Sequence, residues 1–140
     1  MAVVDYIIDG HVATITINRP ESRNAINSEV AVRLTDAWRD IRDNDSVRVA
    51  ILTGTGSVFC AGADLGQLIT LIAGNRSAED EWDEKFIADK TIIESALLRE
   101  FDTEKPVVAA INGHAIAGGM EIVQGTDIRV CVPTAKFGVQ

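Results

Sequence analysis

The sequence is poor in the residues that build metal centres, covalent cross-links and nucleic-acid-binding surfaces. Two cysteines and two histidines are too few for a structural zinc site. Both cysteines lie in apolar, strand-like contexts, which favours buried free thiols over a disulfide. The chain has 13 lysines and arginines but 21 aspartates and glutamates, and the resulting net charge of −8 argues against binding of a nucleic-acid backbone. We therefore expect no metal ion and no nucleic acid.

Long apolar runs and targeting segments are also absent. No run approaches membrane-spanning length, and the N-terminus has no basic stretch followed by an apolar core and a cleavage site. We expect no membrane association and a cytoplasmic location. The 140 residues, 46% of them hydrophobic, suit one packed core, so residues 1–140 are predicted to form a single domain.

The apolar pattern predicts a hairpin followed by repeated strand–helix units, and therefore an α/β fold with a parallel sheet. Strands are expected at 3–8, 12–17, 47–53, 107–111 and 127–132. Helices are expected from an Asn27 or Ser28 cap to Ile41, at 65–72, at 82–101 and from Gly118 onward. The nearly unbroken apolar run at 47–53 is typical of a strand covered on both faces.

Two corners rich in small residues each follow an apolar run and each open a predicted helix. The first is Phe-Cys-Ala-Gly-Ala-Asp-Leu at 59–65, and the second is Ile-Asn-Gly-His-Ala-Ile-Ala-Gly-Gly-Met-Glu at 111–121. Such corners leave backbone N–H groups unpaired and let a ligand approach the main chain, so two of them can hold one oxyanion. Glu121 follows Gly118 by three residues, which places an acid–base carboxylate beside these donors.

Several of these residues have an equally plain structural interpretation. Glu121 also fits a solvated first-turn glutamate, and Asp64 fits the N-cap of the helix that follows it. His114 is a weaker candidate for a base, and Asp127 is expected to accept backbone hydrogen bonds at the start of a buried strand. The aromatic residues of the predicted helix at 82–101 fit a core or an interface. Phosphate-loop, dinucleotide and serine-hydrolase motifs are not matched.

Taken together, these residues resemble the crotonase (enoyl-CoA hydratase/isomerase) superfamily. The resemblance also rests on Arg-Asn-Ala-Ile-Asn at 23–27, Lys-Pro-Val-Val-Ala-Ala-Ile-Asn-Gly at 105–113 and Phe-Gly-Val-Gln at 137–140. It implies the crotonase (ClpP-like) spiral core of repeated β-β-α units and acyl-CoA thioester substrates. It further implies a homo-oligomer, a trimer or hexamer in the family, and no separate cofactor, because coenzyme A enters as part of the substrate.

The resemblance also assigns roles to individual residues. The N–H groups of Ala63 and Gly118 are implied to hold the thioester oxygen, on which enolate-like charge develops. Glu121 occupies the place of the first of two catalytic glutamates in hydratases. The implied substrate-binding residues are Arg23, Ala25, Ile26, Ala61, Gly62, Asp64 and Leu65. Arg23 fits a pyrophosphate contact and a solvated loop arginine equally well.

The resemblance is incomplete at the C-terminal end. The second glutamate would follow Gln140, and family members continue with further sheet and a helical C-terminal region. We therefore expect a core truncated before that region, with little or no hydratase activity by itself. Three functions stay open: an enoyl-CoA hydratase, another crotonase-type reaction such as isomerisation, decarboxylation or thioester hydrolysis, and a non-catalytic acyl-CoA-binding protein.

Overall fold

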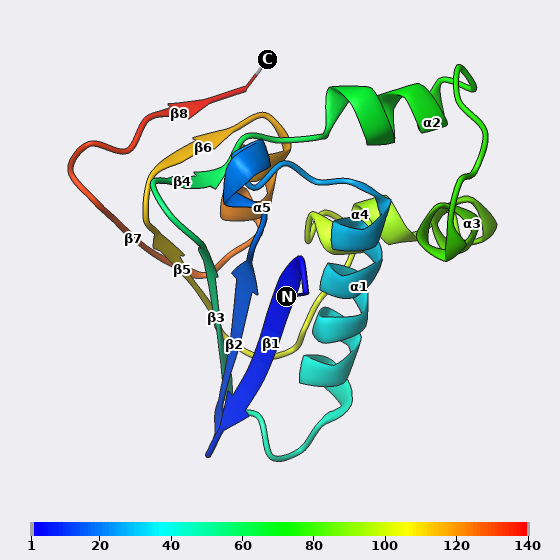
Figure 1. Ribbon diagram of the computed structural model, residues 1–140. Helices are drawn as coiled ribbons and strands as arrows, with labels where there is room; N and C mark the ends of the chain where they lie inside the picture. Colours follow the sequence, from blue (N-terminus) through cyan, green and yellow to red (C-terminus); the bar gives the residue numbers. More distant parts are fainter. Residues whose placement is uncertain (1, 140) are drawn as a thin grey trace.

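Two sheets, one of five strands and one of three, form the frame of the protein (Figure 1). The computed structural model describes residues 2–139. The strands are β1 (Val4–Asp9), β2 (Val12–Ile17), β3 (Val49–Gly54), β4 (Val58–Cys60), β5 (Val107–Ile111), β6 (His114–Ile116), β7 (Ile128–Cys131) and β8 (Phe137–Gly138). The helices are α1 (Ser28–Asp43), α2 (Thr70–Ile72), α3 (Glu81–Ala88), α4 (Ile92–Ala96) and α5 (Gly118–Gln124), with a 3-10 turn η1 (Pro20–Ser22) and a π-helical turn η2 (Leu65–Ile69).

The chain passes back and forth between the two sheets. The larger sheet has the order β1-β2-β3-β5-β7, with β1 antiparallel to β2 and the other pairs parallel. The smaller sheet has the order β4-β6-β8, and its pairs are parallel. Each of β3, β5 and β7 is followed by a strand of the smaller sheet, and helical segments follow β4 and β6. This arrangement confirms the predicted spiral of β-β-α units.

The core lies between the larger sheet and α1. Ala13, Ile15 and Ile17 of β2 are fully buried, and the alternating residues between them are half-buried. Each such isoleucine contributes about 1.5–3 kcal/mol through removal of its side chain from water. Asn27 caps α1 by accepting a hydrogen bond from the Val30 N–H, as predicted, at 3.0 Å. Trp38 is buried on α1, and its indole N–H donates to the Ala96 carbonyl at 3.2 Å.

The single long helix predicted at 82–101 is wrong, because α3 and α4 are separate. Between them the Asp89 carboxylate accepts hydrogen bonds from the Thr91 N–H at 3.0 Å and the Thr91 hydroxyl at 2.6 Å. This local side-chain turn competes with the helical hydrogen bonds. The chain after α4 also leaves helical geometry, since Leu98 has φ 53°. Trp82, Phe86 and Phe101 nevertheless pack against the core, which confirms the plain interpretation of these aromatics.

Burial of the strands differs from two expectations. Residues of β3 alternate between buried and half-buried, so one face of this strand is less covered than predicted. All four residues of β7 are exposed, although a buried strand is predicted there, because β7 is the edge of the larger sheet. Cys131 on this strand is therefore exposed, whereas Cys60 is buried, and both thiols are free. Burial raises the pKa of the Cys60 thiol to about 11.

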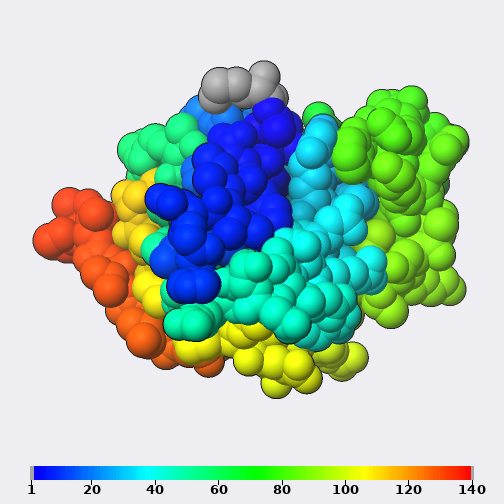
Figure 2. Space-filling model, turned by 90° about the horizontal axis from the view of Figure 1, so that it is seen from below, coloured from blue at the N-terminus to red at the C-terminus, as the bar shows by residue number. Residues whose placement is uncertain are grey.

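The space-filling view places the segments after the first corner and those near the C-terminal end on opposite sides of the N-terminal hairpin (Figure 2). The green region around α3 forms one side, and the orange to red region around β7 and β8 forms the other. Within residues 2–139, no helix is both long and apolar enough to cross a bilayer.

Candidate active site

The first corner turns between β4 and η2 at a glycine with a left-handed backbone. Gly62 has φ +97°, and a Cβ placed there would lie 3.0 Å from both the Ala117 Cβ and the Ile116 carbonyl oxygen. Residues with side chains rarely adopt such a φ, and that separation is tighter than ordinary van der Waals contact. Gly62 is therefore needed both for the turn and for close packing against the second corner.

The second corner holds a non-glycine residue in an unfavourable conformation. Ala117 has φ 50° and ψ −118°. Its N–H donates to the Gly138 carbonyl at 2.8 Å, and its carbonyl accepts from the Glu121 N–H at 3.0 Å. Backbone of this kind costs on the order of 1–3 kcal/mol and persists where surrounding contacts fix it, often at functional sites. A Cβ on Gly119 would overlap the Cys60 carbonyl oxygen, so a second glycine also locks the two corners together.

The two corners leave a pair of backbone donors next to each other. A Cβ on Gly118 would lie 3.6 Å from the Ala63 nitrogen and 3.5 Å from the Gly62 Cα. Within residues 2–139, neither the Ala63 N–H nor the Gly118 N–H donates a hydrogen bond to another group of the chain. The tertiary structure thus brings together two N–H groups that are 55 residues apart in sequence, an arrangement able to bind one oxygen bearing negative charge.

Glu121 lies in the first turn of α5, at the wall of a cavity of about 410 Å³. Its side chain is 35% exposed, and its Oε2 lies 3.9 Å from Nη1 of Arg99. The cavity is also lined by Leu98, Gln124, Gly125 and Val139. The carboxylate is thus neither sealed in the core nor fully in solvent, and neither Ala63 nor Gly118 lines the cavity that it borders. Its acid–base role stays a prediction.

The segment at 23–26 pairs with the first corner. The Ile26 N–H donates to the Gly62 carbonyl and the Ile26 carbonyl accepts from the Asp64 N–H, both at 2.8 Å. These two bonds fix the backbone on either side of Ala63. Arg23 is exposed beside them, and the Ala61 N–H donates to its carbonyl at 3.1 Å. Leu65 is 77% exposed at the start of η2.

Two further residues that hold this segment were not found by sequence reasoning. Asn24 is fully buried, accepts from the Arg19 N–H at 2.9 Å and donates to the carbonyls of Thr55 and Val58 at 2.9 and 2.7 Å. Arg19 is also buried, and its guanidinium donates to the Ala25 carbonyl at 2.6 Å. Their partners lie in other parts of the chain, so no local pattern identifies them.

Asp64 is the N-cap that the sequence predicts. Its Oδ1 accepts from the N–H groups of Gly66 and Gln67 at 3.1 and 2.9 Å. Its Oδ2 forms an ion pair with Arg19 at 3.1 Å, and both side chains are largely buried. The carboxylate is therefore occupied by groups of the chain itself, which favours a role in shaping the corner over direct contact with a ligand.

His114 and Asp127 each accept a hydrogen bond from a backbone N–H of the chain. His114 is exposed, and its Nδ1 accepts from the Lys136 N–H at 3.0 Å. Asp127 accepts from the Val107 N–H at 2.7 Å, which confirms the predicted backbone contact. Within residues 2–139, no group of three potential metal ligands lies together.

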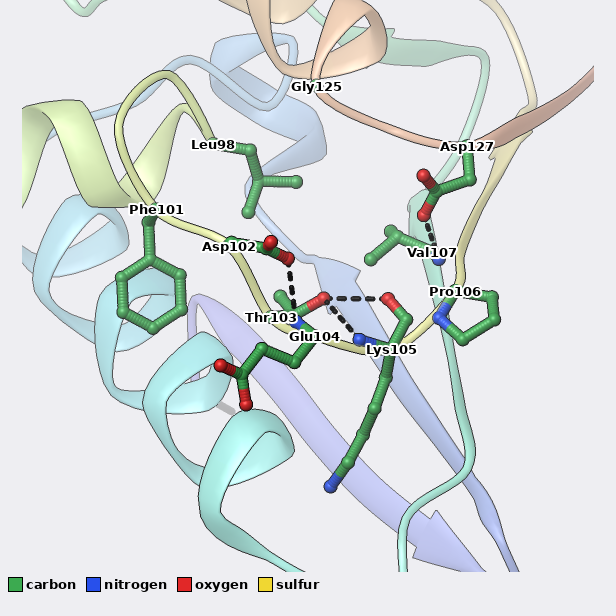
Figure 3. A pocket seen from close by; sticks show the side chains of 10 residues that line it. All are labelled: Leu98, Phe101, Asp102, Thr103, Glu104, Lys105, Pro106, Val107, Gly125 and Asp127. Carbon is green, nitrogen blue, oxygen red and sulfur yellow. Dashed lines mark hydrogen bonds between the residues drawn. The ribbon is translucent and has the colours of Figure 1, made fainter.

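A larger cavity, of about 640 Å³, lies at the opposite ends of β5 and β7 from the corners (Figure 3). Most of its polar side chains already have partners in the chain. Thr103 donates to the Lys105 carbonyl at 2.7 Å, and the Lys105 amine donates to the carbonyls of Ile41 and Asn44. Asp127 on its rim holds the Val107 N–H. Size alone therefore does not make this cavity the stronger candidate, because few of its polar groups are left to recognise a ligand.

Comparison with known proteins shows the family of the chain. The family model for enoyl-CoA hydratase/isomerase matches residues 8–140. An enoyl-CoA hydratase of Mycobacterium tuberculosis is 40% identical over 130 residues, which are 93% of this chain and 46% of that protein. The (E)-benzylidenesuccinyl-CoA hydratase of Thauera aromatica is 34% identical over 133 residues, covering 94% of this chain and 48% of that protein.

Solved structures give the same result. An enoyl-CoA hydratase from Mycobacterium marinum superposes with a TM-score of 0.79 at 30% identity, covering 99% of this chain and 49% of that one. An enoyl-CoA hydratase/isomerase from Mycobacterium paratuberculosis superposes with a TM-score of 0.77 at 34% identity, covering 98% and 52%. The chain spans about half the length of the curated relatives it matches. It belongs to the enoyl-CoA hydratase/isomerase family.

Proposed function

We propose that this chain supplies the thioester-binding part of an enoyl-CoA hydratase active site. The observation that carries the proposal is the adjacency of the Ala63 and Gly118 N–H groups, neither of which has a hydrogen-bond partner among residues 2–139. Two such donors suit the carbonyl oxygen of an acyl-CoA thioester. Relatives whose names include enoyl-CoA hydratase support this substrate class.

In the proposed reaction a water oxygen bonds to the β-carbon of a 2-enoyl thioester. The electrons of the α,β double bond move toward the thioester oxygen, and the resulting enolate-like charge is stabilised by Ala63 and Gly118. A proton leaves the water and a proton is added to the α-carbon, which completes the addition. Removing one donor of this kind typically lowers turnover by about a hundred- to a thousandfold.

Glu121 is the proposed acid–base residue for these proton transfers. It lies on α5, three residues after Gly118, and its half-exposed carboxylate lines a cavity. Such residues contribute roughly a hundred- to ten-thousandfold to rate. The reaction needs no separate cofactor in this proposal.

The coenzyme A portion is proposed to follow the paired backbone of 23–26 and the first corner. Arg23 is exposed at this edge, where a guanidinium can pair with the pyrophosphate. The net charge of −8 makes such local contacts necessary, because the overall field repels an anionic ligand. We also propose a cytoplasmic homo-oligomer, since exposed apolar side chains at Ile128, Val130 and Val139 favour association.

Calorimetric titration with crotonyl-CoA and with free CoA, beside a hydration assay, tests the proposal. Crotonyl-CoA should bind more tightly than CoA, because free CoA lacks the thioester carbonyl oxygen that the two donors are proposed to hold. Glu121→Gln should keep this preference and lose any measurable hydration. Equal affinity for the two ligands would contradict the thioester site. Where the wild-type chain hydrates crotonyl-CoA measurably, a Glu121→Gln variant of equal turnover would contradict the role of that residue.

A further inference from the structure

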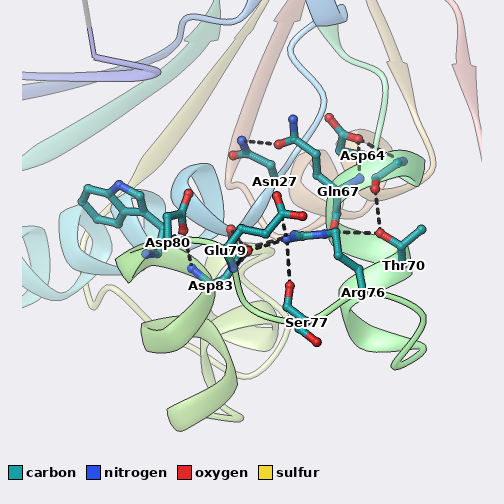
Figure 4. Close-up of polar contacts among 12 residues, drawn as sticks. Asn27, Asp64, Gln67, Thr70, Arg76, Ser77, Glu79, Asp80 and Asp83 are labelled. Carbon is teal, nitrogen blue, oxygen red and sulfur yellow. Dashed lines mark hydrogen bonds and ion pairs between the residues drawn. The ribbon is translucent and has the colours of Figure 1, made fainter.

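Asp83 is a buried carboxylate that none of the proposed chemistry uses. It lies on α3 and is 2% exposed. Its two oxygens accept from the Arg76 guanidinium at 2.6 and 3.1 Å, from the Ser28 hydroxyl at 2.5 Å and from the Glu79 N–H at 3.1 Å (Figure 4). The Arg76 hydrogen bond, followed by that of Ser28, lowers the pKa of this carboxyl to about 2 against the opposing effect of burial. Asp83 is therefore ionised at neutral pH.

One donor to Asp83 lies at the start of α1, shortly after the segment that pairs with the first corner. Ser28 is the first residue of α1, two residues after Ile26. The N–H and carbonyl of Ile26 are bonded to Gly62 and Asp64, the neighbours of Ala63. The Ser28–Asp83 hydrogen bond thus anchors the strand-like segment against which the first corner is built.

The other side-chain donor holds the segment that follows the corner. The Arg76 guanidinium donates to the Gln67 carbonyl through Nη2 at 2.8 Å while it also binds Asp83. The Gln67 N–H in turn donates to Asp64, the cap of η2. Figure 4 shows this chain of contacts running from Asp83 through Arg76 to Gln67 and Asp64. Asp83 consequently connects both segments that flank Ala63.

Apolar packing alone anchors η2 and α2 weakly. Among their residues only Leu68 and Leu71 are buried, while Leu65, Ile69 and Ile72 are exposed. A buried ion pair contributes little net stability compared with apolar side chains of the same volume, but loss of one partner is costly. The ion pair is therefore better explained by the geometry that it fixes than by the stability that it adds.

We propose that Asp83 is a positioning residue for the thioester site. Asp83 holds the Ala63 N–H in place because it fixes the Ser28 and Gln67 segments on either side of the first corner. This inference rests on the proposed function, because it assigns the Ala63 N–H to the thioester oxygen. It adds a residue of α3, 20 positions beyond Ala63, to the machinery that sets the affinity for acyl-CoA.

The test compares Asp83→Asn with Glu84→Gln in the 140-residue chain. Both changes remove one negative charge from α3, but Glu84 is exposed and no hydrogen bond or ion pair of its side chain is found in the described structure. Hydrogen exchange without ligand reports on how firmly the contacts of Asp83 hold the segment after the corner. The amides of residues 65–72 should exchange faster in Asp83→Asn than in wild type, and Glu84→Gln should leave their exchange unchanged. Calorimetry then gives the affinities for crotonyl-CoA and for free CoA.

We expect Asp83→Asn to reduce the affinity for crotonyl-CoA by about three- to tenfold, the equivalent of one weakened hydrogen bond, with less change for CoA. A merely structural role would lower both affinities together and leave their ratio unchanged. Ser28→Ala removes one donor and should give a smaller change of the same kind, which keeps the test valid if Asp83→Asn folds poorly.

The outcomes separate the two proposals. Wild-type chain that binds crotonyl-CoA no better than CoA would overturn the proposed function, and the role of Asp83 with it. If the wild-type chain prefers crotonyl-CoA to CoA, and Asp83→Asn and Ser28→Ala both keep this preference in full, the positioning role alone is overturned. This holds whatever happens to hydrogen exchange. A reduced preference in these variants, with Glu84→Gln unchanged, supports it.

Discussion

Gly62→Ala is the substitution that best tests how the two corners fit together. Gly62 has φ +97°, and its new Cβ would lie 3.0 Å from the Ala117 Cβ and the Ile116 carbonyl oxygen. The left-handed backbone costs a residue with a side chain about 1–2 kcal/mol. Forcing a methyl group into a packed site typically adds another 1–3 kcal/mol. We therefore expect the free energy of unfolding to fall by about 2–5 kcal/mol.

Gly74→Ala is the matched control. Gly74 also has a left-handed backbone, with φ +74°, but a Cβ there would have nothing within 4 Å. This variant should show the backbone cost alone, about 1–2 kcal/mol. The difference between the two variants thus isolates the contact between the corners.

Urea unfolding followed by circular dichroism measures both variants, and calorimetry with crotonyl-CoA reports on the site. Gly62→Ala should lose thioester affinity because the corner that carries the Ala63 N–H must shift, whereas Gly74→Ala should retain it. Equal destabilisation of the two variants, with thioester binding intact in both, would refute the argument that close packing at Gly62 brings the donors together.

Three further predictions concern buried polar and thiol groups. Asn24→Ala should lower the free energy of unfolding by about 2–4 kcal/mol, because the backbone groups of Arg19, Thr55 and Val58 lose their hydrogen bonds to the Asn24 amide. Asn75 is exposed, and Asn75→Ala should have little effect in the same unfolding assay. A thiol reagent at pH 8 should label Cys131 rapidly and Cys60 only on unfolding, because Cys60 is buried with a pKa of about 11. Mass spectrometry locates the label, and fast labelling of both thiols would contradict this prediction. The pKa of Asp83 falls from 3.8 to about 2 on folding, so its ionised form stabilises the protein above pH 4, and this contribution is lost as the pH drops toward 2. The difference in the free energy of unfolding between wild type and Asp83→Asn should therefore narrow over that pH range. A constant difference would argue against the ion pair.

Local chemistry is what the sequence specifies most clearly. The hairpin of β1 and β2, the Asn27 and Asp64 caps and the alternation in β2 follow from hydrogen-bonding capacity and side-chain period, which act over a few residues. The break between α3 and α4 shows the limit of periodicity. Aromatic residues at helical spacing predict one long helix, but the Asp89 side chain offers the backbone a competing turn.

Burial is harder to predict because it depends on what packs against an element. The apolar sequence of β7 predicts a covered strand, yet its position at the edge of the sheet leaves Ile128 and Val130 more than half exposed. Arg19 shows the opposite case, since arginine is mostly exposed in folded proteins unless it is paired. It is buried because Asp64, 45 residues further on, supplies its ionic partner.

The sequence by itself determined which residues have the chemistry for a site: two small-residue corners with spare N–H groups and a carboxylate one turn away from the second. Only the tertiary structure decided that the corners meet. Gly62 and Gly119 have no side chains to keep the corners apart, and the strained Ala117 is held by Gly138 of a third strand. Adjacency of Ala63 and Gly118 arises from packing between distant segments, and no pattern of neighbouring residues encodes such packing.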